Sequence, residues 1–258
     1  MELTLTLILL FGLIVLVTQT LEGITGFGST VLALPFAVMV LGDLNKTVPI
    51  LATHSWILAV YFVIVSWKHI VWKEFGFIAL HVLIGLPVGY YLFKNLDDWY
   101  LKILLAWFMI GVGINGICVT RRSCRQTETP AEPVKKRLLM RVILFLGGVI
   151  HGAFASGGPF IVLYASRTLR DKTLFRVTLC LLWLCLNTIL MIGWTLDRRW
   201  TPDVCYALVV SLPFLLLGIV IGDRLHHRAS EYVFRLIVFA LLVAGGCMVL
   251  YGVVQSAK

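Results

Sequence analysis

The chain alternates long apolar runs with short polar connections. Runs of about 20 residues, enough to cross ~30 Å of hydrocarbon as α-helix, occupy positions 3–21, 48–66, 75–93, 101–119, 174–194, 204–222 and 233–254. They do not alternate polar and apolar residues with a period of two, as the strands of a membrane β-barrel would. The pattern therefore predicts an all-α, polytopic membrane protein.

Two glycine-rich turns interrupt the apolar pattern. The first is EGITGFGST at residues 22–30, and the second is HGAFASGGP at residues 151–159. Apolar sequence flanks both turns, and in the second half the flanking pieces, 138–151 and 158–169, are too short to span comfortably. We expect these pieces to form a helical hairpin that dips into the membrane and returns.

The two turns belong to a longer internal repeat. Superimposing them aligns Glu22 with His151 and Gly28 with Gly157, and further along Gly85 and Gly89 align with Gly218 and Gly222. A single transmembrane domain over 1–258 is thus predicted to contain two repeats, at about 1–120 and 142–258, joined by a polar linker at 121–141. Each repeat crosses the membrane an odd number of times, whether as five crossings or as a hairpin plus three. The chain then has 8–10 apolar segments, and the repeats are inverted relative to each other.

Composition and charge agree with a membrane protein. Hydrophobic residues make up 60% of the chain, charged residues 14%, and the net charge is +9. The basic residues cluster in short loops beside the apolar runs, so they are better explained by orientation in the bilayer than by nucleic-acid binding. Placing the linker in the cytoplasm puts most of the 22 lysines and arginines inside. This predicts a multi-pass protein of the cytoplasmic membrane with both termini outside.

The sequence gives little indication of other bound groups. The six cysteines contain no C-x-x-C pair, and most lie in apolar runs where a thiol behaves as a small hydrophobic group. We therefore expect no metal and no cofactor. The predicted partners are a small anionic substrate and membrane lipid, and a homodimer remains open.

Helices that begin inside a membrane can bind anions. Their first amides have no intrahelical partner, and the helix dipole adds positive character there. Residues 26–30 and 156–159 are plausible helix starts, with Ser29, Thr30 or Ser156 as caps or ligands and Pro159 in first position. The alternative role for the glycines is close helix packing. The candidate substrate-binding residues are Thr25, Gly26, Phe27, Gly28, Ser29, Thr30, Ser156, Gly157 and Gly158, joined by His54, beside Thr53 and Ser55, and by Asn187.

Two titratable residues occupy matching places in the repeats. Glu22 is the one acidic residue, of 13, that lies between apolar segments without a polar loop, and a carboxylate there is costly unless it is paired or protonated. His151 is its counterpart. The hypothesis is that Glu22, His151 or both take up a proton that accompanies the anion; the alternative is a structural hydrogen bond at each hairpin tip. Arg176, at the start of a run, is expected to be a topology charge that reaches the interface.

The order of these motifs resembles the TauE/SafE sulfite exporters and sulfonate permeases. The resemblance lies in Gly23-x-x-Gly26-Phe27-Gly28-Ser29 followed by Pro35-Phe36 in the first repeat. In the second it lies in His151-Gly152-x-x-x-Ser156-Gly157-Gly158-Pro159 followed by Asp171-Lys172-x-x-Phe175-Arg176. It implies transport of a small, often sulfur-containing anion such as sulfite, thiosulfate or an organosulfonate.

Two other functions compete with a permease that works by alternating access. A membrane-embedded enzyme acting on a lipid or small anion would need a nucleophile, base or metal set, and the sequence contains neither H-E-x-x-H nor G-x-S-x-G. A passive anion channel is not excluded by two interrupted helices alone. We expect a permease and no enzymatic activity.

Overall fold

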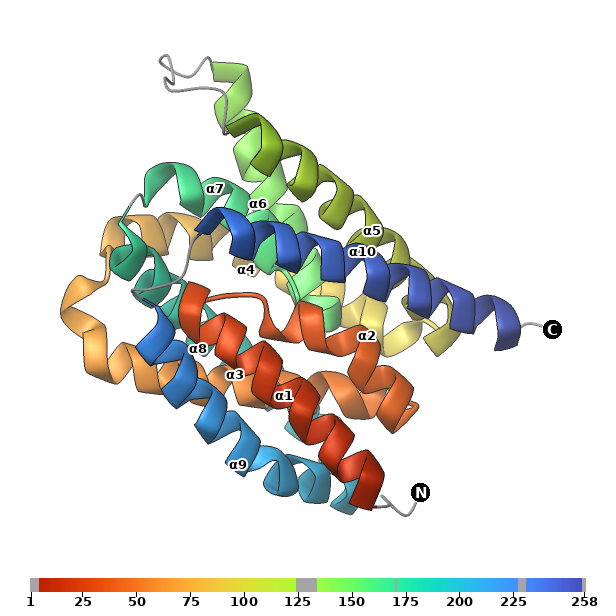
Figure 1. The fold of residues 1–258 in the computed structure, drawn as a ribbon. Coiled ribbons are helices and arrows are strands. Elements are labelled where there is room, and N and C mark those ends of the chain that lie inside the picture. Colours follow the sequence, from red (N-terminus) through yellow and green to blue (C-terminus); the bar gives the residue numbers. More distant parts are fainter. Residues whose placement is uncertain (1–4, 124–133, 170, 227–230, 257–258) are drawn as a thin grey trace.

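The computed structural model describes residues 5–123, 134–169, 171–226 and 231–256, and over these ranges the chain is almost entirely helical (Figure 1). The first repeat contains α1 (Leu5–Thr25), α2 (Ser29–Leu41), α3 (Leu44–Ser66), the 3-10 helix η1 (Trp67–His69), α4 (Trp72–Asn95) and α5 (Asp98–Ser123). The second contains α6 (Val134–Phe154), α7 (Gly158–Thr168), α8 (Lys172–Leu196), α9 (Pro202–Leu225) and α10 (Glu231–Ser256). Most of the predicted linker, 124–133, lies outside the described residues.

Within the described ranges, six helices are long and apolar enough to cross a membrane, namely α1, α3 with η1, α4, α5, α8 and α9. This confirms the predicted polytopic helical class. α3 and α8 are the most buried of the six and lie at the centre of the bundle, whereas the others expose more of their apolar side chains to the surroundings. The exposed side chains suit contact with lipid.

α1 continues to Thr25, beyond the predicted end of the apolar run at 21. The polar residues near the end of α1 do not interrupt the helix, because their hydroxyl groups form hydrogen bonds within it. The hydroxyls of Thr18 and Thr20 donate to backbone carbonyls one turn earlier, each at 2.7 Å. Bonded in this way, a hydroxyl exposes little unsatisfied polarity to a dry environment.

Glycines bring α1 and α9 into close contact. A Cβ added to Gly23 would lie 3.0 Å from the Cα of Gly222, and one added to Gly218 would lie 3.0 Å from the carbonyl oxygen of Leu16. Residue numbers rise in the same direction along both helices at these contacts, so α1 and α9 run parallel. Gly23 therefore serves the close-packing role that small residues have in membrane helices.

α4 and α6 meet in the same way. A Cβ on Gly85 would lie 2.2 Å from the Phe145 carbonyl oxygen, and one on Gly89 would lie 1.8 Å from that of Val149. From the other side, a Cβ on Gly152 would lie 2.1 Å from the Leu86 carbonyl oxygen. The first helix of each repeat thus packs, in parallel, on the fourth helix of the other repeat.

Helices at matching positions in the repeats run antiparallel. Along α3 and α8, Trp56 bonds to Thr188, whereas the later Phe62 lies under the earlier Arg176. α5 and α10 cross with Gly113 near Phe239 and Gly246 near Ile110. These contacts are the ones that inverted repeats require. The duplication itself and the orientation of the termini remain predictions.

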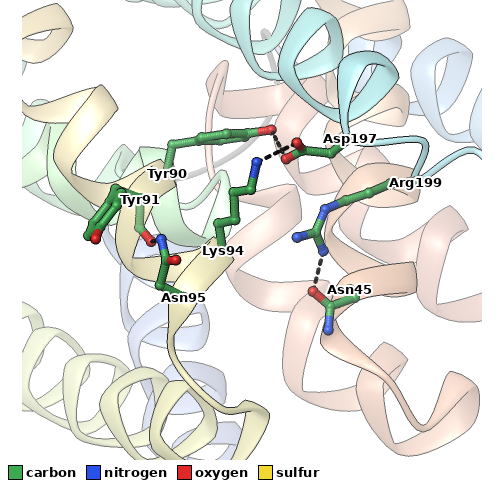
Figure 2. Close-up of polar contacts among 7 residues, drawn as sticks. All are labelled: Asn45, Tyr90, Tyr91, Lys94, Asn95, Asp197 and Arg199. Atoms are coloured by element: carbon green, nitrogen blue, oxygen red, sulfur yellow. Dashed lines mark hydrogen bonds and ion pairs between the residues drawn. The ribbon is translucent and has the colours of Figure 1, made fainter.

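A polar cluster ties the connection between α8 and α9 to the ends of α3 and α4 (Figure 2). Asp197 accepts hydrogen bonds from the Tyr90 hydroxyl and the Lys94 ammonium group, each at 2.7 Å. Arg199 donates to Asn45 and lies over the ring of Phe93, 5.0 Å from its centroid. The cluster therefore connects helix ends of the first repeat to helix ends of the second.

This cluster predicts a pH-dependent contribution to stability. The Lys94 ammonium group, with the Tyr90 hydroxyl, holds the pKa of Asp197 below its ordinary value. A lowered carboxyl pKa in the folded state stabilises above the unfolded pKa of about 3.9, and that contribution is lost as the pH falls through the folded value. In detergent near neutral pH, Asp197→Asn should cost about 0.5–1 kcal/mol, and the difference from wild type should shrink in acid.

The matched control is Asp97→Asn, because Asp97 is an exposed carboxylate at the same end of α4. Thermal unfolding of the three proteins over a pH series measures the difference. Equal losses for both variants, or a loss at Asp197 that does not depend on pH, would contradict the assignment.

Candidate functional site

Both glycine-rich turns break a helix with the same local geometry. Gly26 has φ 81° and donates its amide to the Glu22 carbonyl at 2.6 Å. Ala155 has φ 51° and donates to the His151 carbonyl at 2.7 Å. A left-handed residue that closes the last helical turn is a common helix C-terminus, usually occupied by glycine. Alanine at the second break therefore holds a backbone conformation that costs it some stability.

The helices that follow start from glycines without a side-chain cap. Gly28 precedes α2 and Gly157 precedes α7, and neither residue has a side chain that could cap the helix it precedes. The predicted caps are therefore wrong: the Ser29 hydroxyl bonds to Glu22, and the Ser156 hydroxyl bonds to the Phe154 carbonyl at 2.9 Å. Pro159 is the second residue of α7 rather than the first. The first amides of both helices remain without intrahelical partners.

The two breaks meet at one small cavity between the repeats. Its wall contains residues from both breaks and from the central helices α3 and α8. The lining residues are Glu22, Gly28, Thr30, Val31, Ser55, His151, Ala155, Ser156, Gly158 and Trp183. The cavity is thus polar at several points, although apolar helices surround it.

The Glu22 carboxylate is buried on one side of this cavity. One of its oxygens accepts a hydrogen bond from the Ser55 hydroxyl at 2.8 Å, and the other accepts one from Ser29. Among the residues that the structure describes, no lysine or arginine forms an ion pair with it. The site therefore holds an acidic group that two hydroxyls satisfy and no cation neutralises.

His151 lies on the wall of the same cavity, in the matching place of the second repeat. Its Nε2 is 3.1 Å from Asn187 Oδ1, and its ring stacks on Trp183 with 5.4 Å between centroids. The Trp183 indole donates to the Gly26 carbonyl at 2.7 Å. His151 Nδ1 is buried, and no group in the described part of the chain bonds to it. Each repeat thus links its broken helix to a polar residue on its own third helix.

The structure divides the predicted binding residues into three groups. Those on the cavity wall are Gly28, Thr30, Ser156 and Gly158, together with Ser55 from the neighbourhood of His54. Those that hold a wall residue are Ser29, which bonds to Glu22, and Asn187, which lies against His151. Those not on the wall are Thr25, Gly26, Phe27, Gly157 and His54.

Residues in the third group have other contacts. The Thr25 hydroxyl donates to the Leu21 carbonyl at 2.8 Å, and the Phe27 ring packs edge-on against Phe175. His54 faces Ser211 of α9, with 2.9 Å between Nε2 and the hydroxyl oxygen. Trp183, by contrast, lines the cavity without having been predicted. It sits in an apolar run, where nothing in the sequence separates a site tryptophan from a lipid-facing one.

Arg176 differs from its predicted role at the membrane interface. Its side chain is buried, donates to Asp223 at 3.0 Å and to the Gly23 carbonyl at 3.1 Å, and stacks over Phe62. The guanidinium therefore joins α8 to α1, α3 and α9. The reason is its partner. The Asp223 carboxylate compensates the positive charge and so lowers the cost of burying the guanidinium.

Helices long and apolar enough to span a membrane, with two broken helices around a buried polar cavity, are an architecture typical of membrane transporters. The family model described as Sulfite exporter TauE/SafE matches residues 10–249, so the chain belongs to this family. The protein is accordingly a membrane transporter and not an enzyme.

A curated relative gives a second comparison. The probable inner membrane transporter protein TsaS of Comamonas testosteroni is 23% identical over 185 residues, which cover 70% of this chain and 73% of that protein. No solved structure matches the chain significantly. Within the described residues, no group of three or more histidine, cysteine or acidic side chains is placed to hold a metal ion.

Proposed function

We propose that this protein carries a small anion, such as sulfite, thiosulfate or an organosulfonate, across the cytoplasmic membrane by alternating access. The observation that carries the proposal is the shared cavity, which the starts of α2 and α7 reach from different repeats. Unpaired amides and the positive ends of two helix dipoles favour an anion at such a place.

The composition of the cavity wall favours a site that can release its anion over one that binds it too tightly for transport. Hydroxyls, backbone groups, an imidazole and the Glu22 carboxyl group line it, and none of its residues is lysine or arginine. A buried salt bridge would strengthen binding through the low dielectric around it. Binding by amides and hydroxyls is weaker, so the anion can be released on the far side.

The family and the relative support the choice of substrate and membrane. The family description names sulfite export, and the relative's name places that protein in an inner membrane. The antiparallel pairing of matching helices supports alternating access, because inverted repeats allow two related states, each open to one side. Coupling to a proton through Glu22 or His151 is part of the proposal.

Uptake into reconstituted vesicles tests the proposal. We expect labelled thiosulfate or sulfite to enter at a rate that saturates with concentration and to be inhibited by related sulfur oxyanions. Flux that does not saturate would indicate a channel. No flux for any sulfur anion or sulfonate would contradict the proposed function.

Alanine at Gly158 is expected to reduce this uptake about 10-fold or more. A Cβ there would meet nothing closer than Phe27 at 3.6 Å, so neither packing nor backbone conformation demands glycine. The methyl group would instead occupy the cavity beside the start of α7. Loss of one hydrogen bond to a charged ligand costs ~1.5–3 kcal/mol, and 1.4 kcal/mol is tenfold.

The control is Gly111→Ala, on an exposed face of α5 where a Cβ also meets nothing within 4 Å. Both variants should keep the thermal stability of wild type in detergent. Equal uptake by the two variants would show that Gly158 does not border the transported anion.

A further inference from the structure

The cavity has two unequal halves, although the repeats place matching elements around it. In the first half, the start of α2 already has an anion of the protein's own. The Glu22 carboxylate accepts hydrogen bonds from the Ser29 hydroxyl and the Ser29 backbone, at the first residue of α2. The partial positive charge at the N-terminus of α2 thus already interacts with Glu22 and is less available to a substrate.

In the second half, the start of α7 has no such occupant. Gly158 is the first residue of α7 and lies on the cavity wall, and a Cβ there would make only ordinary van der Waals contact, with Phe27 at 3.6 Å. The first helical hydrogen bond is donated by Ile161 to the Gly157 carbonyl at 3.3 Å, so the amides of Gly158 and Phe160 have no partner within the helix. This end of the cavity can therefore donate to an anion.

An independent observation points to the same end. His151 is buried on the cavity wall, and its Nδ1 has no hydrogen-bond partner in the described part of the chain. Turning the Asn187 amide lets Nε2 accept from Asn187 while Nδ1 carries the proton as an uncommitted donor on a residue that lines the cavity, because the amide oxygen and nitrogen are interchangeable in shape. Neutral His151 then offers a third donor beside the α7 amides.

The two halves cannot both be negatively charged at little cost. An ionised Glu22 and a bound anion would share one small cavity, where weak screening makes like charges repel strongly. A neutral Glu22 removes the repulsion and can keep both serine contacts, because its carbonyl oxygen accepts from one hydroxyl while its own O–H donates to the oxygen of the other. The anion and the proton on Glu22 should therefore bind together.

We propose that the repeats have divided the work: the anion binds at the α7 start beside His151, and Glu22 at the α2 start is the proton site that must be neutral for the anion to bind. The inference rests on the proposed transport function and specifies its coupling. Each anion that crosses is accompanied by one proton, so uptake follows the proton gradient.

Other titratable groups around Glu22 do not replace it in this role. From α6, His151 lies on the wall of the same cavity; from α8, Cys180 and Arg176 lie nearby; and from α9, Asp223 lies beside Gly23. Arg176 is committed to Asp223 and to the Gly23 carbonyl. Glu22 is consequently the carboxylate on the cavity wall whose charge the anion meets.

Binding to the purified wild-type protein gives the first test. Thiosulfate and methanesulfonate are suitable probes because both stay ionised between about pH 5 and about pH 8, where protein groups such as histidine titrate. Calorimetry in buffers of different ionisation enthalpy counts the protons taken up with each anion. We expect a count near one and weaker binding as the pH rises. A count near zero would overturn the inference, and a count near two would assign proton uptake to His151 as well and overturn the division.

Two variants test the halves separately. Glu22→Gln should bind thiosulfate with an affinity that no longer depends on pH and is close to that of wild type in acid. His151→Gln should bind about 10-fold to 100-fold more weakly, for loss of a charge-assisted hydrogen bond, yet keep the pH dependence. The control is Asp97→Asn, far from the cavity, which should behave as wild type.

The outcomes separate the two proposals. If wild type binds no sulfur anion or sulfonate at any pH, the proposed function fails. If wild type binds them but Glu22→Gln keeps the pH dependence, or binding requires sodium in place of protons, only the division of work is overturned. A folded Glu22→Gln variant that no longer binds at all would also overturn it, because Glu22 would then contact the anion.

Discussion

Replacing Gly89 by alanine is expected to be among the most damaging single changes in the chain. The added Cβ would lie 1.8 Å from the Val149 carbonyl oxygen and 2.7 Å from its carbonyl carbon. Both are backbone atoms of α6 and cannot rotate away, so α4 and α6 would have to separate. We expect a loss of about 3 kcal/mol or more in stability, at the upper end for overpacking. Thermal unfolding in detergent measures it.

Gly76→Ala is the matched control in the same helix. A Cβ at Gly76 meets nothing within 4 Å, and alanine is the better helix former by about 1 kcal/mol. This variant should be as stable as wild type or slightly more stable. Similar unfolding temperatures for the two variants would mean that α4 and α6 do not cross closely at Gly89.

Removing the Arg176 side chain is the second change with a large expected effect. Arg176→Met would leave the Asp223 carboxylate without its cation and the Gly23 carbonyl without its donor. Breaking a fully buried ion pair from one side costs about 3–5 kcal/mol. The Asp223 side chain is 36% exposed, so water compensates part of the remaining charge, and we expect a loss of about 2–3 kcal/mol. We expect a strongly lowered unfolding temperature and a reduced yield of folded protein.

The double variant Arg176→Met with Asp223→Leu removes both charges and should recover part of the loss. Arg224→Met is the control, since Arg224 is the exposed neighbour of Asp223. Arg176→Met alone should be clearly less stable than Arg224→Met. If the double variant were no better than Arg176→Met, the effect would come from lost packing on Phe62 rather than from charge.

The helices could be predicted well because lipid imposes a simple requirement on length and hydrophobicity. The two breaks were also predicted within a residue or two, since glycine is the usual residue for a left-handed helix end. Ala155 was harder, because no propensity favours alanine at φ 51°. The sequence predicted a helix start at 156–159 but no left-handed residue at Ala155.

The roles of individual glycines could not be predicted from sequence. Site formation and close packing were alternatives for the whole motif, and the structure uses both. Gly23 and Gly152 sit at helix crossings, whereas Gly28 and Gly158 line the cavity. Glycine looks identical in either role, and only the neighbouring helix decides which applies.

Side-chain direction limited the prediction of the site in the same way. His54 and Ser55 are adjacent, so they point to different sides of α3: Ser55 reaches Glu22, and His54 reaches Ser211. The rotation of a mostly apolar helix depends on all of its contacts. Arg176 was misplaced for a related reason, because its partner Asp223 lies in another helix, 47 positions away along the chain.

The indole of Trp183 has a mechanical consequence. It stacks on His151 at the tip of one hairpin and bonds to the Gly26 carbonyl at the tip of the other. A movement of either tip relative to the other would therefore have to break one of these two contacts or carry Trp183 with it. Under the proposed alternating access, this shared side chain would couple the motions of the two repeats.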